Sequence, residues 1–197
     1  GVALAGTCME AGKTAAACAI VSRMRHRGLS VHAFKATGVS LRRDILAMED
    51  SGARRSMIFT DLGIVTTTSA SGPALTRTML TEMTQGHPDV VVFELGDGIL
   101  GAYGVEAILA ADDVRRALTA VVLSANDPVA AWGGVKLLRE RFEIDPCAVT
   151  GPSTDNAVGV NIIEEQMGVR ACNAITAGAA LGDHVIEKLG LGARTRP

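Results

Sequence analysis

The nine residues from Gly6 to Thr14 read G-x-x-x-x-x-G-K-T, which is the pattern of a phosphate-binding loop, G-x-x-x-x-G-K-[ST], with one additional residue between the glycines. The glycines let the backbone curl so that its N–H groups and the start of the next helix face a phosphate. Lys13 is expected to neutralise the β- and γ-phosphates of a nucleotide, and the Thr14 hydroxyl to ligate Mg²⁺. The predicted nucleotide contacts are Gly6, Thr7, Cys8, Met9, Glu10, Ala11, Gly12, Lys13 and Thr14.

The context of this motif supports the phosphate-binding interpretation. An apolar strand candidate precedes it and an Ala-rich helical segment follows it, which excludes most chance matches. The alternative is a plain strand-to-helix turn with a solvated lysine. Two of the four lysines, Lys13 and Lys35, fall at the ends of the first two predicted strands, where ligands bind in open α/β sheets.

Acidic residues near other predicted strand ends are candidate magnesium ligands. Glu94 ends an apolar run and precedes a glycine-rich turn, where a metal-binding carboxylate is expected, with Asp97 assisting through water. Asp44 follows Lys35 in the chain and is either a metal ligand or a first-turn acid that faces a helix dipole. Glu94 has its own alternative, a solvated carboxylate at a strand end. The predicted metal ligands are Thr14, Asp44 and Glu94, and the predicted catalytic residues are Lys13 and Lys35.

The hydroxyl-rich stretch from Thr66 to Pro73 has two interpretations. It either binds a substrate carboxylate or forms a plain capped loop before a helix. We expect the substrate pocket to be built from this stretch and from residues 94–103. Asp61, at the end of the third predicted strand, is a further candidate acid.

Short apolar runs alternate with longer amphipathic ones along the chain, which predicts a mostly parallel sheet with helices on both faces. The predicted strands are 2–5, 30–35, 56–60, 89–94, 119–124, 146–150 and 170–174. The predicted helices are 12–27, 41–51, 73–86, 127–142, 155–167 and 179–189. We expect one nucleotide-binding domain over residues 1–190 and a disordered tail over 191–197, together forming the C-terminal domain of a longer chain.

Composition excludes several other functions. The chain has 197 residues, of which 48% are hydrophobic and 20% charged, and its net charge is −2, without a basic block for nucleic acid. No apolar run is long enough to span a membrane. The four cysteines are widely spaced and predict reduced thiols in a cytoplasmic protein.

The segment from Val2 to Gly38 resembles dethiobiotin synthetase, a P-loop NTPase family. In that family a GT-x-x-E-x-GKT loop and a helix precede a strand that ends in an aromatic-Lys pair and a nearby Thr/Ser-Gly. The corresponding residues here are Gly6-Thr7, Glu10, Gly12-Lys13-Thr14, Phe34-Lys35 and Thr37-Gly38. The segments 43–47 and 92–96 resemble the parts of that family that carry its metal-binding Asp and Glu.

This resemblance, which covers about half of the chain, implies a three-layer P-loop NTPase fold and a homodimer. It also implies Mg²⁺ on Thr14, Asp44 and Glu94, and phosphates on Lys13 and Lys35. The spacer after Lys35 and the residues after Glu94 depart from the family pattern, which leaves its diamino-acid substrate in doubt. Residues 94–109 and the 36–38 turn also resemble the C-terminal P-loop domain of DgcN-like proteins.

The adenine-binding residues are predicted from strand order. Residues 125–127 read Ala-Asn-Asp, as in the adenine-binding turn of dethiobiotin synthetase, but they follow a strand one position too early. The equivalent turn is Thr150, Gly151 and Pro152, which we take as the adenine contacts. The sequence contains no N-K-x-D motif for guanine, which favours ATP over GTP.

The leading hypothesis is an ATP- and Mg²⁺-dependent enzyme that activates a small-molecule carboxylate or carbamate by phosphoryl transfer. One alternative is a nucleotide-binding regulatory domain of a larger protein. Another is a small-molecule kinase with Asp44 or Asp97 as its general base.

Overall fold

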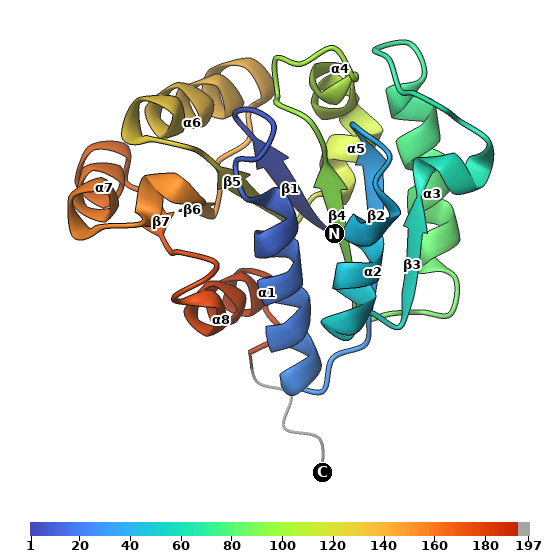
Figure 1. Ribbon diagram of the computed structural model, residues 1–197, viewed down its shortest axis with the longest axis horizontal. Helices are drawn as coiled ribbons and strands as arrows, with labels where there is room; N and C mark the ends of the chain where they lie inside the picture. The colour runs from blue at the N-terminus through green and yellow to red at the C-terminus, as the bar shows by residue number, and fades with distance from the viewer. Residues whose placement is uncertain (193–197) are drawn as a thin grey trace.

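The apolar runs of the sequence form the strands of a parallel sheet in the computed structural model, which describes residues 1–192 (Figure 1). Within these residues the sheet has seven strands in the order β3-β2-β4-β1-β5-β6-β7, and each neighbouring pair is parallel. The strands are β1 (Val2–Gly6), β2 (Val31–Thr37), β3 (Arg55–Ile58), β4 (Val90–Leu95), β5 (Ala120–Ser124), β6 (Ala148–Thr150) and β7 (Arg170–Ala171).

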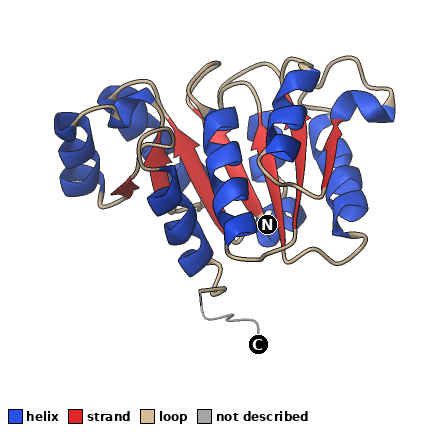
Figure 2. Ribbon diagram, turned by 60° about the horizontal axis from the view of Figure 1, so that its bottom comes forward, coloured by secondary structure: helices blue, strands red, loops and turns tan. Residues whose placement is uncertain are grey.

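Helices cover both faces of this sheet, as Figure 2 shows. They are α1 (Lys13–His26), α2 (Arg42–Asp50), α3 (Gly72–Thr84), α4 (Val105–Ala110), α5 (Asp112–Ala117), α6 (Pro128–Phe142), α7 (Ala157–Ile162) and α8 (Gly178–Lys188). The predicted α/β architecture, with a parallel sheet between two helical layers, is therefore confirmed.

The core lies in two apolar layers, one on each side of the sheet. Strand β1 shows the reason, because successive side chains of a strand point to opposite faces. Ala3 and Ala5 belong to the layer under α3 to α6, whereas Val2 and Leu4 belong to the layer under α1 and α8. Both faces of the central strand are thus buried, which fixes β1 and the loop that follows it.

The structure differs from several of the predicted elements, and the strands predicted over 146–150 and 170–174 are shorter, spanning only Ala148–Thr150 and Arg170–Ala171. The third strand ends at Ile58, because the Asp61 carboxylate accepts a hydrogen bond from the Ile58 N–H (2.9 Å) and turns the chain into a 3-10 helix, Phe59–Leu62. Helices α4 and α5 were not predicted, since each has only six residues, too few for a helical periodicity to emerge.

The predicted helix 155–167 begins at Ala157 and runs to Met167, but its type changes along its length. Asn156 caps α7 by accepting a hydrogen bond from the Gly159 N–H (3.0 Å), and the chain then continues as a π-helical turn, Ile163–Met167. Leu191, the first residue of the predicted tail, packs against the core, and residues 193–197 lie outside the described residues. Among the helices of residues 1–192, none is long and apolar enough to cross a membrane.

Candidate phosphate-binding site

The loop from Gly6 to Thr14 connects the end of β1 to the start of α1, as the sequence predicts. Gly12 adopts a left-handed conformation (φ 95°), which glycine tolerates without steric cost, and α1 begins at the next residue. The Lys13 side chain folds back over the loop, and its Nζ donates a hydrogen bond to the Cys8 carbonyl oxygen (2.8 Å). Among residues 1–192, no side chain makes a capping hydrogen bond at the N-terminus of α1. The first N–H groups of a helix have no partner within the helix and form a common anion-binding position.

Glu10 stands in the same loop with a positive φ of 58°, which is uncommon for a residue with a side chain. Its side chain is exposed. The loop therefore holds one residue in a strained conformation, which is frequent at ligand-binding sites.

The charge of Lys13 is strongly influenced by its surroundings. Burial lowers the pKa of Lys13 below its usual value, because desolvation disfavours the charged form. The nearby carboxylates of Glu94 and Asp97 oppose this shift by attracting the charge. An anion bound in the loop would act in the same direction as these carboxylates.

Glu94 lies below the loop because of strand register. On β4 it pairs with Leu4 of β1 on one side and with Lys35 of β2 on the other. Its Oε2 accepts a hydrogen bond from the Thr14 hydroxyl (2.8 Å), and only 3% of the residue is exposed. Two residues that are 80 positions apart in the chain are thus brought together, as the predicted magnesium site requires.

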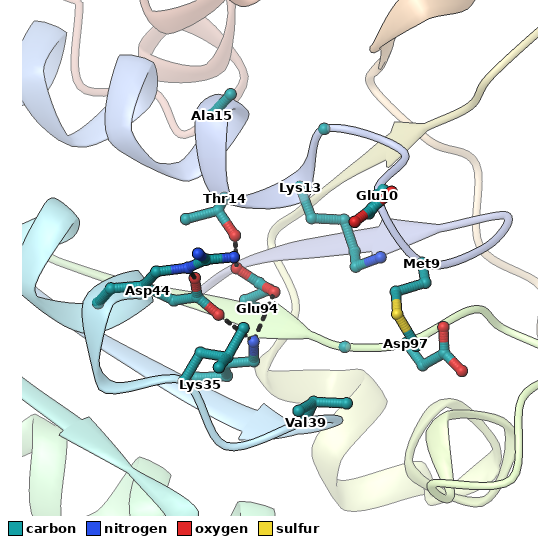
Figure 3. Close-up of a pocket in the computed structure, with 14 residues that line it drawn as sticks. Met9, Glu10, Lys13, Thr14, Ala15, Lys35, Val39, Asp44, Glu94 and Asp97 are labelled. Atoms are coloured by element: carbon teal, nitrogen blue, oxygen red, sulfur yellow. Dashed lines mark hydrogen bonds and ion pairs between the residues drawn. The ribbon is translucent and has the colours of Figure 1, made fainter.

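The Lys35 ammonium contacts both predicted acidic ligands, Asp44 and Glu94, as Figure 3 shows. Its Nζ makes a short ion pair with the Asp44 carboxylate and lies 3.5 Å from Glu94 Oε1. Lys35, Asp44 and Glu94 are all buried. The three strand-end and helix-start positions singled out in the sequence therefore form one cluster with the phosphate-binding loop.

A pocket of about 310 Å³ opens over this cluster. Its remaining walls come from the loop and from the segments after β2 and β4, in particular Val39, Leu41, Arg43, Gly96 and Asp97. The volume lies in the range of small-molecule sites. Lining residues thus supply cations, carboxylates and an apolar wall in one cavity.

The donor set suits magnesium. One hydroxyl, Thr14, and two carboxylates, Asp44 and Glu94, converge within hydrogen-bond or ion-pair reach of one another or of Lys35. Within residues 1–192 no group of three or more His, Cys, Asp or Glu side chains is placed to bind a metal. Mg²⁺ needs no such cage, because it commonly takes one or two carboxylates and completes its shell with water and phosphate oxygens.

The segment after β6 packs against the other side of the loop. Gly151 has a positive φ of 90°, and a Cβ there would lie 2.3 Å from the Ala11 carbonyl oxygen. The Thr150 side chain is buried, and its Oγ1 accepts a hydrogen bond from the Ala174 N–H (3.1 Å). Of the three predicted adenine contacts, Thr150 is therefore buried, whereas Gly151 is partly exposed and Pro152 is exposed.

Asn126 contacts the loop, although the turn 125–127 that contains it was set aside in favour of 150–152 as the adenine-binding segment. The Asn126 Nδ2 donates a hydrogen bond to Cys8 Sγ (3.2 Å), so the turn after β5 also contacts the loop. The Ala-Asn-Asp stretch was the available signal, and β5 lies directly beside β1 in the sheet. The neighbouring Asp127 caps α6, since its carboxylate accepts a hydrogen bond from the Ala130 N–H (2.8 Å).

Three predicted parts of the site lie wholly or partly outside the pocket: the stretch 66–73, the segment 94–103 and Asp61. The stretch from Thr66 to Pro73 does not line it, and Thr68 and Ser71 instead bond to each other through their hydroxyls and backbone N–H groups, which is a capped loop. Of the predicted segment 94–103, the pocket includes Glu94, Gly96 and Asp97. The Asp61 carboxylate accepts the hydrogen bond from the Ile58 N–H in its own turn and forms an ion pair with Arg42 (3.1 Å).

No protein-family model matches the sequence, and no curated protein matches it. Solved structures do match its fold. Chloroplast FtsY from Physcomitrella patens superposes with a TM-score of 0.65 at 13% identity, over 95% of this chain and 64% of that one. The signal recognition particle receptor FtsY from Elizabethkingia anophelis superposes with a TM-score of 0.64 at 14% identity, over 93% and 64%.

A third match is the signal recognition particle 54 kDa protein from Aeropyrum pernix K1, solved in complex with GDP. Its TM-score is 0.56 at 18% identity, over 97% of this chain and 46% of that one. The chain thus spans less than two thirds of the length of each of these proteins. At these identities the likeness concerns the fold alone, and the chain has the fold of a P-loop NTPase.

Proposed function

We propose that this protein binds ATP with Mg²⁺ in the Gly6–Thr14 loop and transfers the γ-phosphoryl group to a small carboxylate-bearing acceptor in the adjoining pocket. The observation that carries the proposal is the convergence of Lys13, Thr14, Lys35, Asp44 and Glu94 around one 310 Å³ cavity. The absence of an N-K-x-D motif from the sequence favours ATP as the nucleotide.

The residues of the site divide the work by charge. Lys13 and the N–H groups of the loop would hold the β- and γ-phosphates, and Lys35 would offset charge on the transferring group. Thr14, Asp44 and Glu94 would hold Mg²⁺, which bridges phosphate oxygens and neutralises their developing charge. The protein thus contributes positioning and electrostatic stabilisation.

A carboxylate acceptor fits the site better than a hydroxyl. A hydroxyl must lose a proton to a general base, and because Asp44 and Glu94 are already engaged with Lys35 it would depend on Asp97, whereas an ionised carboxylate needs no base. A carboxylate oxygen attacks phosphorus directly: the new O–P bond forms as the bond between the γ-phosphorus and the bridging oxygen breaks, and ADP leaves. The resulting acyl phosphate is then open to attack by an amine, which releases phosphate. Arg43 at the rim could bind a second anionic group of the acceptor.

Calorimetric titration with ATP·Mg²⁺ and GTP·Mg²⁺, followed by phosphate release with a panel of carboxylates, tests this function. We expect tighter binding of ATP and release that a carboxylate stimulates. Tight binding without stimulated release would instead identify a nucleotide-binding regulatory domain. Stimulation by hydroxyl compounds alone would favour a kinase that uses Asp97 as its base.

Substitution of Lys13 provides a direct check. Lys13→Ala removes the cation that faces the phosphates, so we expect turnover to fall by roughly 10²-fold or more, as for the loss of other transition-state charge contacts. Circular dichroism should show an intact fold. The matched control is Lys136→Ala on the exposed surface of α6, which should keep wild-type turnover. Unchanged turnover in Lys13→Ala would refute the assignment.

A further inference from the structure

The ammonium group of Lys35 occupies the position between the two carboxylates that the proposed function assigns to magnesium. It is ion-paired to Asp44 and lies 3.5 Å from Glu94 Oε1, while Glu94 Oε2 accepts the Thr14 hydroxyl (2.8 Å). Figure 3 shows the Lys35 side chain pointing toward these carboxylates. A lysine is thus bound by one oxygen of each carboxylate that would coordinate the metal.

The ammonium and a divalent ion compete for Asp44 Oδ2 and Glu94 Oε1. Mg²⁺ needs oxygen ligands at about 2.0–2.1 Å, whereas an ammonium holds its acceptors at about 2.7–2.9 Å. The two cations would also repel each other at close range in a buried site. Binding of the metal between Asp44 Oδ2 and Glu94 Oε1 therefore requires the Lys35 ammonium to leave.

The site offers the ammonium another position. The flexible four-carbon stem of lysine permits such a movement, and Lys35 lines the pocket. Gly96 forms the adjacent wall: a Cβ there would lie 3.4 Å from Lys35 Cε and 3.5 Å from Glu94 Oε1, so the glycine leaves room around both groups. Phosphate oxygens in the pocket would provide the ammonium with a new anionic partner.

We infer that Lys35 is an internal competitor for the magnesium site, which the metal displaces toward the phosphates of the nucleotide. This inference rests on the proposed function. It makes metal and nucleotide binding strongly cooperative: the metal alone must break the Lys35 ion pairs without compensation, whereas metal with nucleotide gives the ammonium a new partner. Because such coupling is reciprocal, the nucleotide binds weakly without metal for the same reason. A permanently fixed ion triad would produce no such cooperativity through Lys35.

Electron paramagnetic resonance of Mn²⁺ tests the competition independently of turnover. In Lys35→Met the competitor is absent, so we expect Mn²⁺ alone to bind roughly tenfold or more tightly than to the wild type. The enhancement of Mn²⁺ affinity by a non-hydrolysable ATP analogue should shrink by a comparable factor. Lys136→Met removes one positive charge from the exposed surface of α6 and should behave as the wild type. Unchanged or weaker Mn²⁺ binding by Lys35→Met overturns the inference.

A measurement on the wild type covers the case in which Lys35→Met does not fold. The chain has four lysines, so lysine labelled with ¹³C at Cε gives four signals, which Lys13→Arg, Lys136→Met and Lys188→Met assign. We expect Mg²⁺ with the analogue to shift both the Lys13 and the Lys35 signals. If the Lys13 signal shifts and that of Lys35 does not, the competition is refuted while nucleotide binding stands. If neither signal shifts, both proposals fail.

Discussion

Lys13 combines two properties that ordinarily oppose each other, since it carries the charge that phosphate binding needs and yet is buried. Burial lowers its pKa below the usual 10.5, and Glu94 and Asp97 limit this decrease. In the pH window between the lowered pKa and 10.5 the folded protein binds fewer protons than the unfolded chain. The contribution of this group to stability therefore increases with pH through that window.

The titration of Lys13 can be measured by competitive labelling with an amine reagent over a pH series. We expect Lys13 to lose its proton at lower pH than the side chain of a short lysine peptide that is added as the internal reference. Bound nucleotide should raise the pKa of Lys13 again, because phosphate favours the ammonium form. The affinity for nucleotide should accordingly fall as the pH rises through the pKa of Lys13 in the nucleotide-free protein. Identical labelling profiles for Lys13 and the reference peptide would contradict this account.

At the scale of elements, parallel strands position the site. The carboxyl ends of β1, β2 and β4 meet at one edge of the sheet, and their register places Leu4, Lys35 and Glu94 side by side. The turn after β6 supports the loop from the other side, where Gly151 lies against Ala11. The shape of the phosphate-binding loop therefore depends on a segment about 140 residues away in the chain.

Gly151→Ala should distort the loop from a distance. Its Cβ would meet the carbonyl oxygens of Ala11 (2.3 Å) and Ala125 (2.8 Å), at a backbone position with positive φ. We expect a loss of about 1–3 kcal/mol in the free energy of unfolding, with weakened nucleotide binding. Denaturant titration and calorimetry measure the two effects.

The matched control is Gly133→Ala, in the middle of α6. A Cβ there meets nothing within 4 Å, so this variant should instead gain about 0.5–1 kcal/mol of stability. If both variants behaved alike, close packing at Gly151 would not be the cause.

A ligand that binds the folded protein and not the unfolded chain raises the free energy of unfolding of the whole molecule. At a nucleotide concentration of about 100 times Kd, the free energy of unfolding should rise by about 2.7 kcal/mol. Thermal unfolding with ATP should show a larger increase in Tm with Mg²⁺ than with a chelator, because Thr14, Asp44 and Glu94 would hold the metal.

Glu94→Gln tests the metal dependence of this stabilisation. Loss of one carboxylate should remove most of the difference between Mg²⁺ and chelator, while Glu140→Gln on the surface of α6 keeps it. An undiminished Mg²⁺ effect in Glu94→Gln would exclude this residue from the metal site.

The sequence by itself determined the parallel α/β architecture and the loop from Gly6 to Thr14. Both are local signals: a phosphate-binding loop is a contiguous motif, and buried parallel strands are continuous apolar runs. Lys35 and Glu94 were also predictable as strand-end residues, because ligands gather at the carboxyl ends of parallel strands. Elements of six residues, such as α4 and α5, were not, since so short a segment carries no clear period.

The tertiary structure alone decided which distant residues touch. The placement of β4 between β2 and β1 puts the Lys35 ammonium between Asp44 and Glu94, and the placement of β5 beside β1 brings Asn126 to Cys8. Strand order and register result from packing across both faces of the sheet, which depends on all layers at once. A residue's type and local spacing therefore indicate which chemistry it could perform, whereas its partner depends on the packing of the whole sheet.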